Sequence, residues 1–277
     1  LVLKPLTASL QQKATSWDLT FSTPEAQGTV TYSNGNPAMP WSLHLAALHL
    51  PESASRKDEG KCTPYNTSGP HVLPPSALAD LNPASLPAAQ VNIDKLTQGG
   101  KPIGRVSFNL TPIDNGASLN QLRGQVYGMQ LLGFNQADAR LTWTKFDNTH
   151  HTNFDARLRA VNLADVLTAM QEPVSITSAA ASLNVSLVWD GAPDQGGMAN
   201  YLGFVQMDIQ KGTFTKGASS GANPLLKLLG FLNFDNLGRR LRFDFTDLNT
   251  QGMAFDQVSG RIDFANGQLS LSEPLKV

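Results

Sequence analysis

Few residues in this 277-residue sequence have types and spacing that could do chemistry. The sole cysteine, Cys62, lies in a polar stretch rich in Pro and Ser, so an unreactive loop position is favoured over a nucleophile. His150 and His151 are candidate metal ligands, but adjacent residues on a strand point to opposite faces, and the other His residues and Cys62 lie far away in the sequence. We therefore predict that the two histidines are exposed turn residues.

Other catalytic and cofactor patterns are missing from the sequence. Gly124 and Gly128 form a glycine pair inside an alternating stretch, which predicts a bulge or close packing and not a phosphate-binding loop. No Gly-x-Ser-x-Gly motif occurs, and the acidic residues are spread over polar positions instead of being paired for acid–base work. The sequence predicts a protein that is not an enzyme and has no metal and no cofactor.

Composition narrows the functional class further. Hydrophobic residues make up 41% of the chain and charged residues only 16%, with a net charge of −1. A nucleic-acid-binding protein would show clustered Lys and Arg, and a disordered tail would show few large apolar residues. No apolar run reaches the roughly 18 residues that a membrane-spanning helix needs.

The elements that position these residues are mainly strands. Strict alternation of apolar and polar residues predicts strands with one apolar and one solvated face, which is typical of an antiparallel sheet. Asn-Gly turns at 33–36, 114–116 and 265–267 predict hairpins between successive strands. The alternating stretches are 17–21, 106–110, 139–143, 154–160, 183–189, 205–209, 241–245, 262–264 and 269–271, with weaker ones at 30–32, 41–50, 91–93 and 122–127.

Two helices and one long connection interrupt this pattern. Asn223 and Pro224 form a helix start. The stripe that follows is apolar at i, i+3, i+4 and i+7. A second short helix is predicted over 162–170, and a Pro-rich loop, with one turn of helix near 76–81, over 51–90. The leucines of the first helix, which we expect at the end of a groove, are Leu225, Leu228, Leu229 and Leu232.

The C-terminal third resembles a known family. The stretches 223–233, 237–248 and 251–260, supported by 81–88, 102–105 and 187–193, are similar to the C-terminal region of AsmA-like proteins of the YhdP branch. The resemblance implies a periplasmic protein of a Gram-negative bacterium, anchored to the inner membrane by an N-terminal helix that lies outside this chain. It also implies a long β half-pipe that carries phospholipid between the inner and outer membranes, with no catalytic residues.

We therefore expect residues 1–277 to be one elongated segment of a longer chain, with a loop at 51–90 and an amphipathic helix region at 223–240. The predicted fold is mostly β, an elongated, curled antiparallel sheet with a few short helices. Exposing the roughly thirty methylenes of a phospholipid to water costs on the order of 20 kcal/mol of free energy. A groove that carries the lipid therefore needs an unbroken apolar lining. The predicted lining residues are Val106, Phe108, Leu141, Trp143, Leu183, Val185, Leu187, Val205, Met207, Ile209, Leu241, Phe243, Phe245, Ile262 and Phe264.

An alternative remains open. The apolar strand faces could bury each other in a closed β scaffold. Such a scaffold would serve as an envelope docking module, with the helix near Lys227, Arg239 and Arg240 or the 51–90 loop binding a partner. In either case the predicted partners are phospholipid and the two membranes or their proteins, not nucleic acid, and we expect a monomer.

Overall fold

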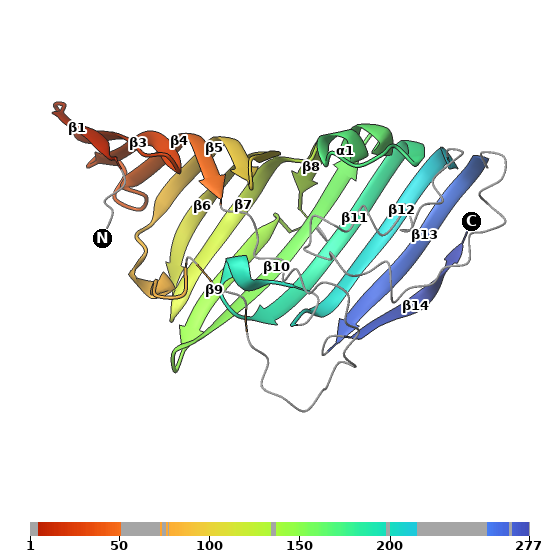
Figure 1. Ribbon diagram of the computed structural model, residues 1–277. Coiled ribbons are helices and arrows are strands. Elements are labelled where there is room, and N and C mark those ends of the chain that lie inside the picture. Colours follow the sequence, from red (N-terminus) through yellow and green to blue (C-terminus); the bar gives the residue numbers. More distant parts are fainter. Residues whose placement is uncertain are drawn as a thin grey trace.

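One curled sheet contains all 14 strands that the computed structural model describes (Figure 1). The structure describes residues 5–50, 73, 76, 78–133, 137–197, 200–214, 254–265 and 268–276. The predicted helix at 223–240 and strand at 241–245 lie outside these residues. The first seven strands are β1 (Thr7–Gln12), β2 (Ser16–Ser22), β3 (Ala26–Ser33), β4 (Trp41–Leu50), β5 (Ala89–Gln98), β6 (Lys101–Ile113) and β7 (Gly116–Val126).

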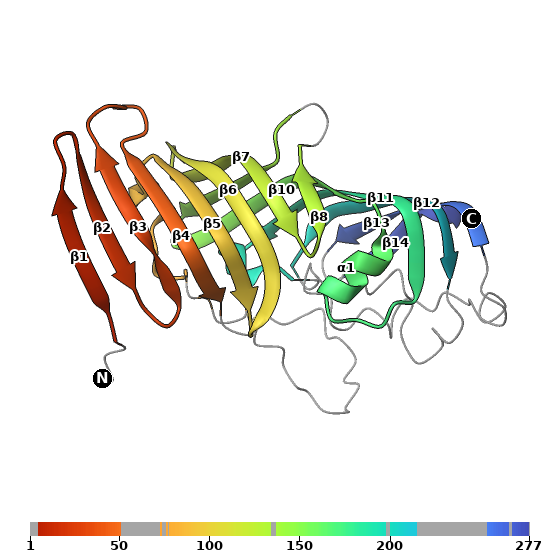
Figure 2. The same ribbon diagram turned by 90° about the horizontal axis from the view of Figure 1, so that it is seen from above.

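The remaining strands continue the same sheet toward the C-terminus, and Figure 2 shows them side by side in nearly sequential order. Two 3₁₀ turns, η1 (Pro83–Ser85) and η2 (Pro193–Gln195), and one helix, α1 (Leu163–Ala169), accompany them. The strands are β8 (Met129–Leu132), β9 (Arg140–Phe146), β10 (Thr149–Ala160), β11 (Ile176–Asp190), β12 (Leu202–Phe214), β13 (Ala254–Ala265) and β14 (Gln268–Lys276).

The prediction of a mostly β, curled sheet with few helices is confirmed, with one exception to the antiparallel pattern. β4 and β5 pair in parallel, whereas every other described pair is antiparallel. Parallel neighbours need a connection that returns to the starting end of the sheet. The Pro-rich stretch between these two strands has that role, and it ends at residue 88 because β5 begins at Ala89. The turn of helix expected near 76–81 is a turn closed by the hydrogen bond from Leu81 N to Leu78 O.

The helix predicted over 162–170 is confirmed as α1. Asn162 caps it, since its side-chain oxygen accepts a hydrogen bond of 3.0 Å from the Ala164 backbone N–H. Leu163, Val166 and Leu167 are buried on one side, at the spacing of a helix stripe. The helix therefore packs against β11 instead of standing free.

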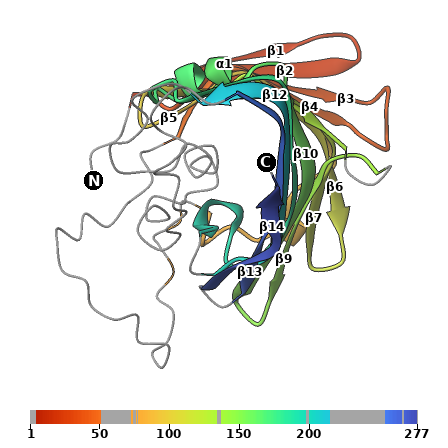
Figure 3. The same cartoon turned by 90° about the vertical axis from the view of Figure 1, so that its right-hand side faces the viewer.

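The sheet curls about an axis that runs across the strands. Figure 3 looks along this axis and shows η2 inside the curl. The ring of Tyr201, in the loop that follows η2, packs 5.4 Å from the ring of Trp189 and 6.2 Å from the ring of Phe264, both on the apolar face. The apolar face is therefore the concave one.

Candidate functional site

A row of apolar residues crosses the concave face in strict register. Each member is the paired partner of the next across the sheet, from β2 to β14, so their side chains share one face. The paired positions lie on successive strands, and nearly all of them carry an apolar side chain. We call this set the central row: Trp17, Tyr32, Trp41, Ala89, Leu110, Leu119, Leu141, Phe154, Leu187, Gly203, Phe264 and Leu269.

Gly203 occupies its place in the central row for a steric reason. Its φ is +124°, and a methyl group at this position would lie 2.1 Å from the carbonyl oxygen of Ser186. No side chain fits there without displacing β11, so the backbones of β11 and β12 approach closely between Leu187 and Phe264.

Further apolar rows run parallel to the central row on the C-terminal half of the sheet. The first joins Ala156, Val185, Val205 and Ile262, the second Leu158, Leu183 and Met207, and the third Ala160, Ala181, Ile209 and Val258. All of these side chains are buried and belong to one cluster with α1. The apolar face is therefore several residues wide on β10–β13.

Exposure of the apolar face differs sharply between the two ends of the sheet. On β1 and β2, Leu10 is 63% exposed and Trp17 44% exposed. On β11 and β12, Val185 and Val205 are completely buried. Strands β4 to β6 lie between these extremes, with a small cluster centred on Leu45, Val91 and Ile93. The concave face is thus open at its N-terminal end and covered at its C-terminal end.

The predicted lining residues that the structure describes all fall on this concave face. Val106, Phe108 and Leu141 are half-buried there. Leu241, Phe243, Phe245 and the leucines of the 225–232 helix lie outside the described residues, and contact with lipid stays a prediction for the whole set. The buried members are Trp143, Leu183, Val185, Leu187, Val205, Met207, Ile209, Ile262 and Phe264.

Sequence reasoning left the N-terminal strands out of the site. Leu19, Val30 and Leu43 continue the apolar face by direct pairing on β2, β3 and β4. Their alternation was visible in the sequence, but it is weak on β3, where Gly28 takes a place on the apolar face, and on β4, where the register shifts after Leu45. The pairing of β4 with β5 joins them to Val91, which no local pattern could have indicated.

His150 corrects the prediction that both histidines are exposed turn residues. Both lie on β10, and His150 is buried beside Trp143 on the concave face. The indole N–H of Trp143 donates to His150 Nδ1 at 2.9 Å, so Nδ1 carries no proton and Nε2–H donates to Ala79 O, also at 2.9 Å. His151 points to the other face, as alternation predicts, and its Nδ1 lies 2.7 Å from Asp190 Oδ1.

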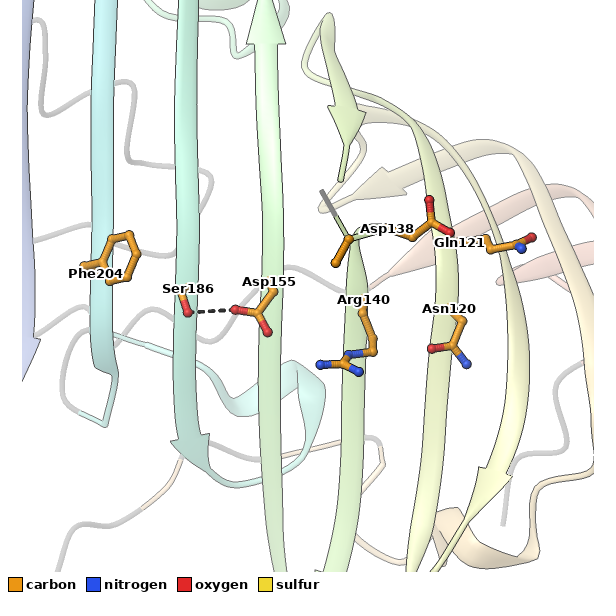
Figure 4. A pocket seen from close by; sticks show the side chains of 8 residues that line it. Asn120, Gln121, Asp138, Arg140, Asp155, Ser186 and Phe204 are labelled. Atoms are coloured by element: carbon orange, nitrogen blue, oxygen red, sulfur yellow. Dashed lines mark hydrogen bonds between the residues drawn. The ribbon is translucent and has the colours of Figure 1, made fainter. Parts of the chain in front are cut away.

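Polar side chains line a pocket on the opposite, convex face (Figure 4). The pocket has a volume of about 560 Å³ and is lined by residues that include Asn120, Arg140, Asp155 and Phe204. The Ser186 hydroxyl donates to Asp155 at 2.7 Å and joins β10 to β11. A serine held by a carboxylate alone lacks the imidazole that activates serine nucleophiles, so this contact is a cross-strand link.

Two further observations concern membranes and metals. Within the described ranges, no helix combines the length and apolar character that crossing a membrane requires. The same residues contain no group of three or more His, Cys, Asp or Glu placed to hold a metal ion.

Comparison with known proteins is consistent with this geometry. The chain is 24% identical over 263 residues to the intermembrane phospholipid transporter YhdP of Escherichia coli strain K12. This alignment covers 92% of the chain but only 19% of that relative, so the chain spans about a fifth of its length. No solved structure matches significantly. The family model for the YhdP protein matches residues 1–275, and the chain therefore belongs to the YhdP family.

Proposed function

We propose that this chain is a periplasmic segment of a lipid-transfer protein that shields phospholipid acyl chains on its concave face between the inner and outer membranes. The observation that carries the proposal is the central row, which keeps apolar groups in register across the sheet. Each methylene moved out of water is worth about 0.8 kcal/mol, so a continuous row lets a chain slide across strands without being exposed.

The polar character of the convex face supports the same proposal. On strands β2 to β5 this face carries a paired polar series, Asp18, Thr31, Ser42 and Gln90. Such a face keeps the sheet in water while the concave face holds apolar cargo. The membership of a family that includes an intermembrane phospholipid transporter supports phospholipid as that cargo.

Photocrosslinking tests the proposal in the full-length protein. Phe21→p-benzoylphenylalanine places a reactive ketone on the open part of the concave face, and Phe108→p-benzoylphenylalanine places one further along it. We expect both to label co-purified phospholipid, detected by mass spectrometry. The matched control is Ser42→p-benzoylphenylalanine on the convex face of β4, and equal labelling at this position would rule out a one-sided lipid path.

A closed scaffold with a docking role is the second candidate. Burial of the concave face on β10–β13 under α1 and Tyr201 favours a closed scaffold for that part of the sheet. If it holds, substitutions on the exposed face of β1 and β2 will leave lipid transfer unchanged. Loss of lipid transfer in the variant Leu19→Asp would exclude the closed scaffold.

A further inference from the structure

Two segments far apart in the sequence meet on the concave face at the ends of β9 to β12. The strap consists of Ser76 and residues 78–85, which precede β5. The ledge consists of residues 191–197 with Asn200 and Tyr201, which join β11 to β12. The Ser76 hydroxyl donates to Asp194 Oδ1 at 2.6 Å and ties one to the other.

The ledge is fixed by buried groups. The Trp189 indole N–H donates to Ala192 O at 3.0 Å, and the Ala192 N–H donates to Gln195 Oε1 at 2.9 Å. Tyr201 packs edge-on against Trp189 and Phe264, and burial raises the pKa of its phenol well above the ordinary value. Removing the ledge would expose three aromatic rings, so it is a permanent part of the fold.

Among its described residues, the strap is held differently, by polar contacts and by the packing of η1 through Pro83. Besides the Ser76 contact, Ala79 O accepts hydrogen bonds from His150 Nε2 at 2.9 Å and from Lys145 Nζ at 3.5 Å. Pro83 alone is buried among residues 78–85, and most of the others are exposed. A hydrogen bond of this kind contributes little net stability, because water replaces it on opening. Segments with so few buried apolar contacts open locally far more readily than the whole fold.

The strap covers apolar surface that belongs to the candidate lipid path. Trp143 is buried beneath the strap, beside His150. It is paired with Thr152 on β10, and Thr152 is in turn paired with Trp189 on β11. Trp143 also lies one step along β9 from Leu141 of the central row. Opening the strap would therefore extend the accessible apolar face from β7 onto β9 and β10.

We propose that the strap is a removable cover that opens to admit a phospholipid acyl chain from the open strands β1–β7 onto the strands beneath the strap, β9 and β10. This inference rests on the proposed function and adds the regulation of its site. The fixed ledge is the part against which the strap closes, and the contact between Ser76 and Asp194 is the latch.

A disulfide across the latch tests the inference in the full-length protein. Ser76→Cys and Asp194→Cys are combined with Cys62→Ser, so that the new thiols have no competitor within this chain. Phe21→p-benzoylphenylalanine reports lipid on the open part, and Phe154→p-benzoylphenylalanine reports lipid beyond the strap. Reduction of the same sample with dithiothreitol is the internal control. Ser16→Cys with Ser33→Cys, a paired position on β2 and β3, is the control disulfide.

The expected result is a loss of lipid labelling at Phe154 of about fivefold or more on oxidation, with labelling at Phe21 unchanged and full recovery on reduction. The control disulfide should have no effect. A weaker latch, Ser76→Ala, should raise labelling at Phe154, which tests the inference even if the double-cysteine variant folds poorly.

Two outcomes would overturn the inference, and they are distinguishable. Equal labelling at Phe154 in the oxidised and reduced states, or no labelling there while Phe21 is labelled, would show that the strap does not gate the path. Absence of label at both positions in the reduced protein would instead overturn the proposed lipid path, and the inference with it.

Discussion

Leu19 on β2 is 38% exposed, whereas Leu187 on β11, on the same face of the same sheet, is 1% exposed. Both residues lie in apolar rows of the sheet: Leu19 is paired with Leu10 and Val30, and Leu187 is paired with Phe154 and Gly203. What differs is the cover, because α1 and the ledge pack on the C-terminal half of this face. Alternation thus determines which face is apolar, but not whether that face meets protein, lipid or water.

The apolar residues of the two regions therefore contribute to different properties of the protein. Buried side chains on β10–β13 stabilise the fold, since each removes apolar area from water. Exposed side chains on β1–β2 contribute little to stability and leave apolar surface unsatisfied, which marks an interaction surface. Substitutions in the two regions should therefore change different properties.

The largest expected effect is on stability. Leu187→Ala removes buried methyl groups and leaves a cavity, so the free energy of unfolding should fall by about 2–5 kcal/mol. Leu19→Ala, made as the matched variant, should cost less than about 1 kcal/mol because its side chain is already partly in water. Urea denaturation measures both values. Similar losses at the two positions would contradict the contrast between a covered and an open region.

The covered region should also depend on its buried polar contacts. His150→Ala leaves the Trp143 indole N–H without an acceptor and frees Ala79 O, so the free energy of unfolding should fall by about 2–3 kcal/mol. His151→Ala removes an exposed pair with Asp190, worth about 0–1 kcal/mol, and a ring contact with the exposed Phe146. A cost at His151 as large as that at His150 would mean that the cover over Trp143 is not what stabilises this end.

The open region should instead control transfer. Leu43→Asp places a charge on the half-buried apolar face of β4, where an acyl chain would have to pass it. We expect transfer of a fluorescent phospholipid between vesicles to slow by about tenfold, and urea denaturation checks that the variant is still folded under the conditions of the assay. Ser42→Asp, on the convex face of the same strand, is the control. Unchanged transfer in Leu43→Asp would place the lipid path elsewhere.

The sequence predicted the sheet and its sidedness, because a period of two is a local signal. Phe154 and Leu187 were assigned correctly to strands for that reason. The parallel pairing of β4 with β5 could not be predicted, since it depends on how a Pro-rich connection of about forty residues returns to the sheet. His150 was misplaced because its burial depends on Trp143 and Ala79, which lie 7 and 71 residues away.

The smallest expected effect concerns the electrostatics of the open end. Hydrogen bonds from Lys13 and Thr31 hold the pKa of Asp18, on β2, below its ordinary value. A lowered pKa favours the folded state above the pKa of the unfolded chain, and this contribution is lost as the pH falls through the lower, folded value.

Lys13→Met should therefore raise the pKa of Asp18 in an NMR titration of its carboxyl carbon. The same substitution should leave the unfolding of β10–β13 unchanged at pH 7, because the first hairpin shares no apolar cluster with those strands among the described residues. An unchanged pKa would mean that Thr31, which donates across β2 and β3, dominates this site, and that the hairpin is held by its strand pairing alone.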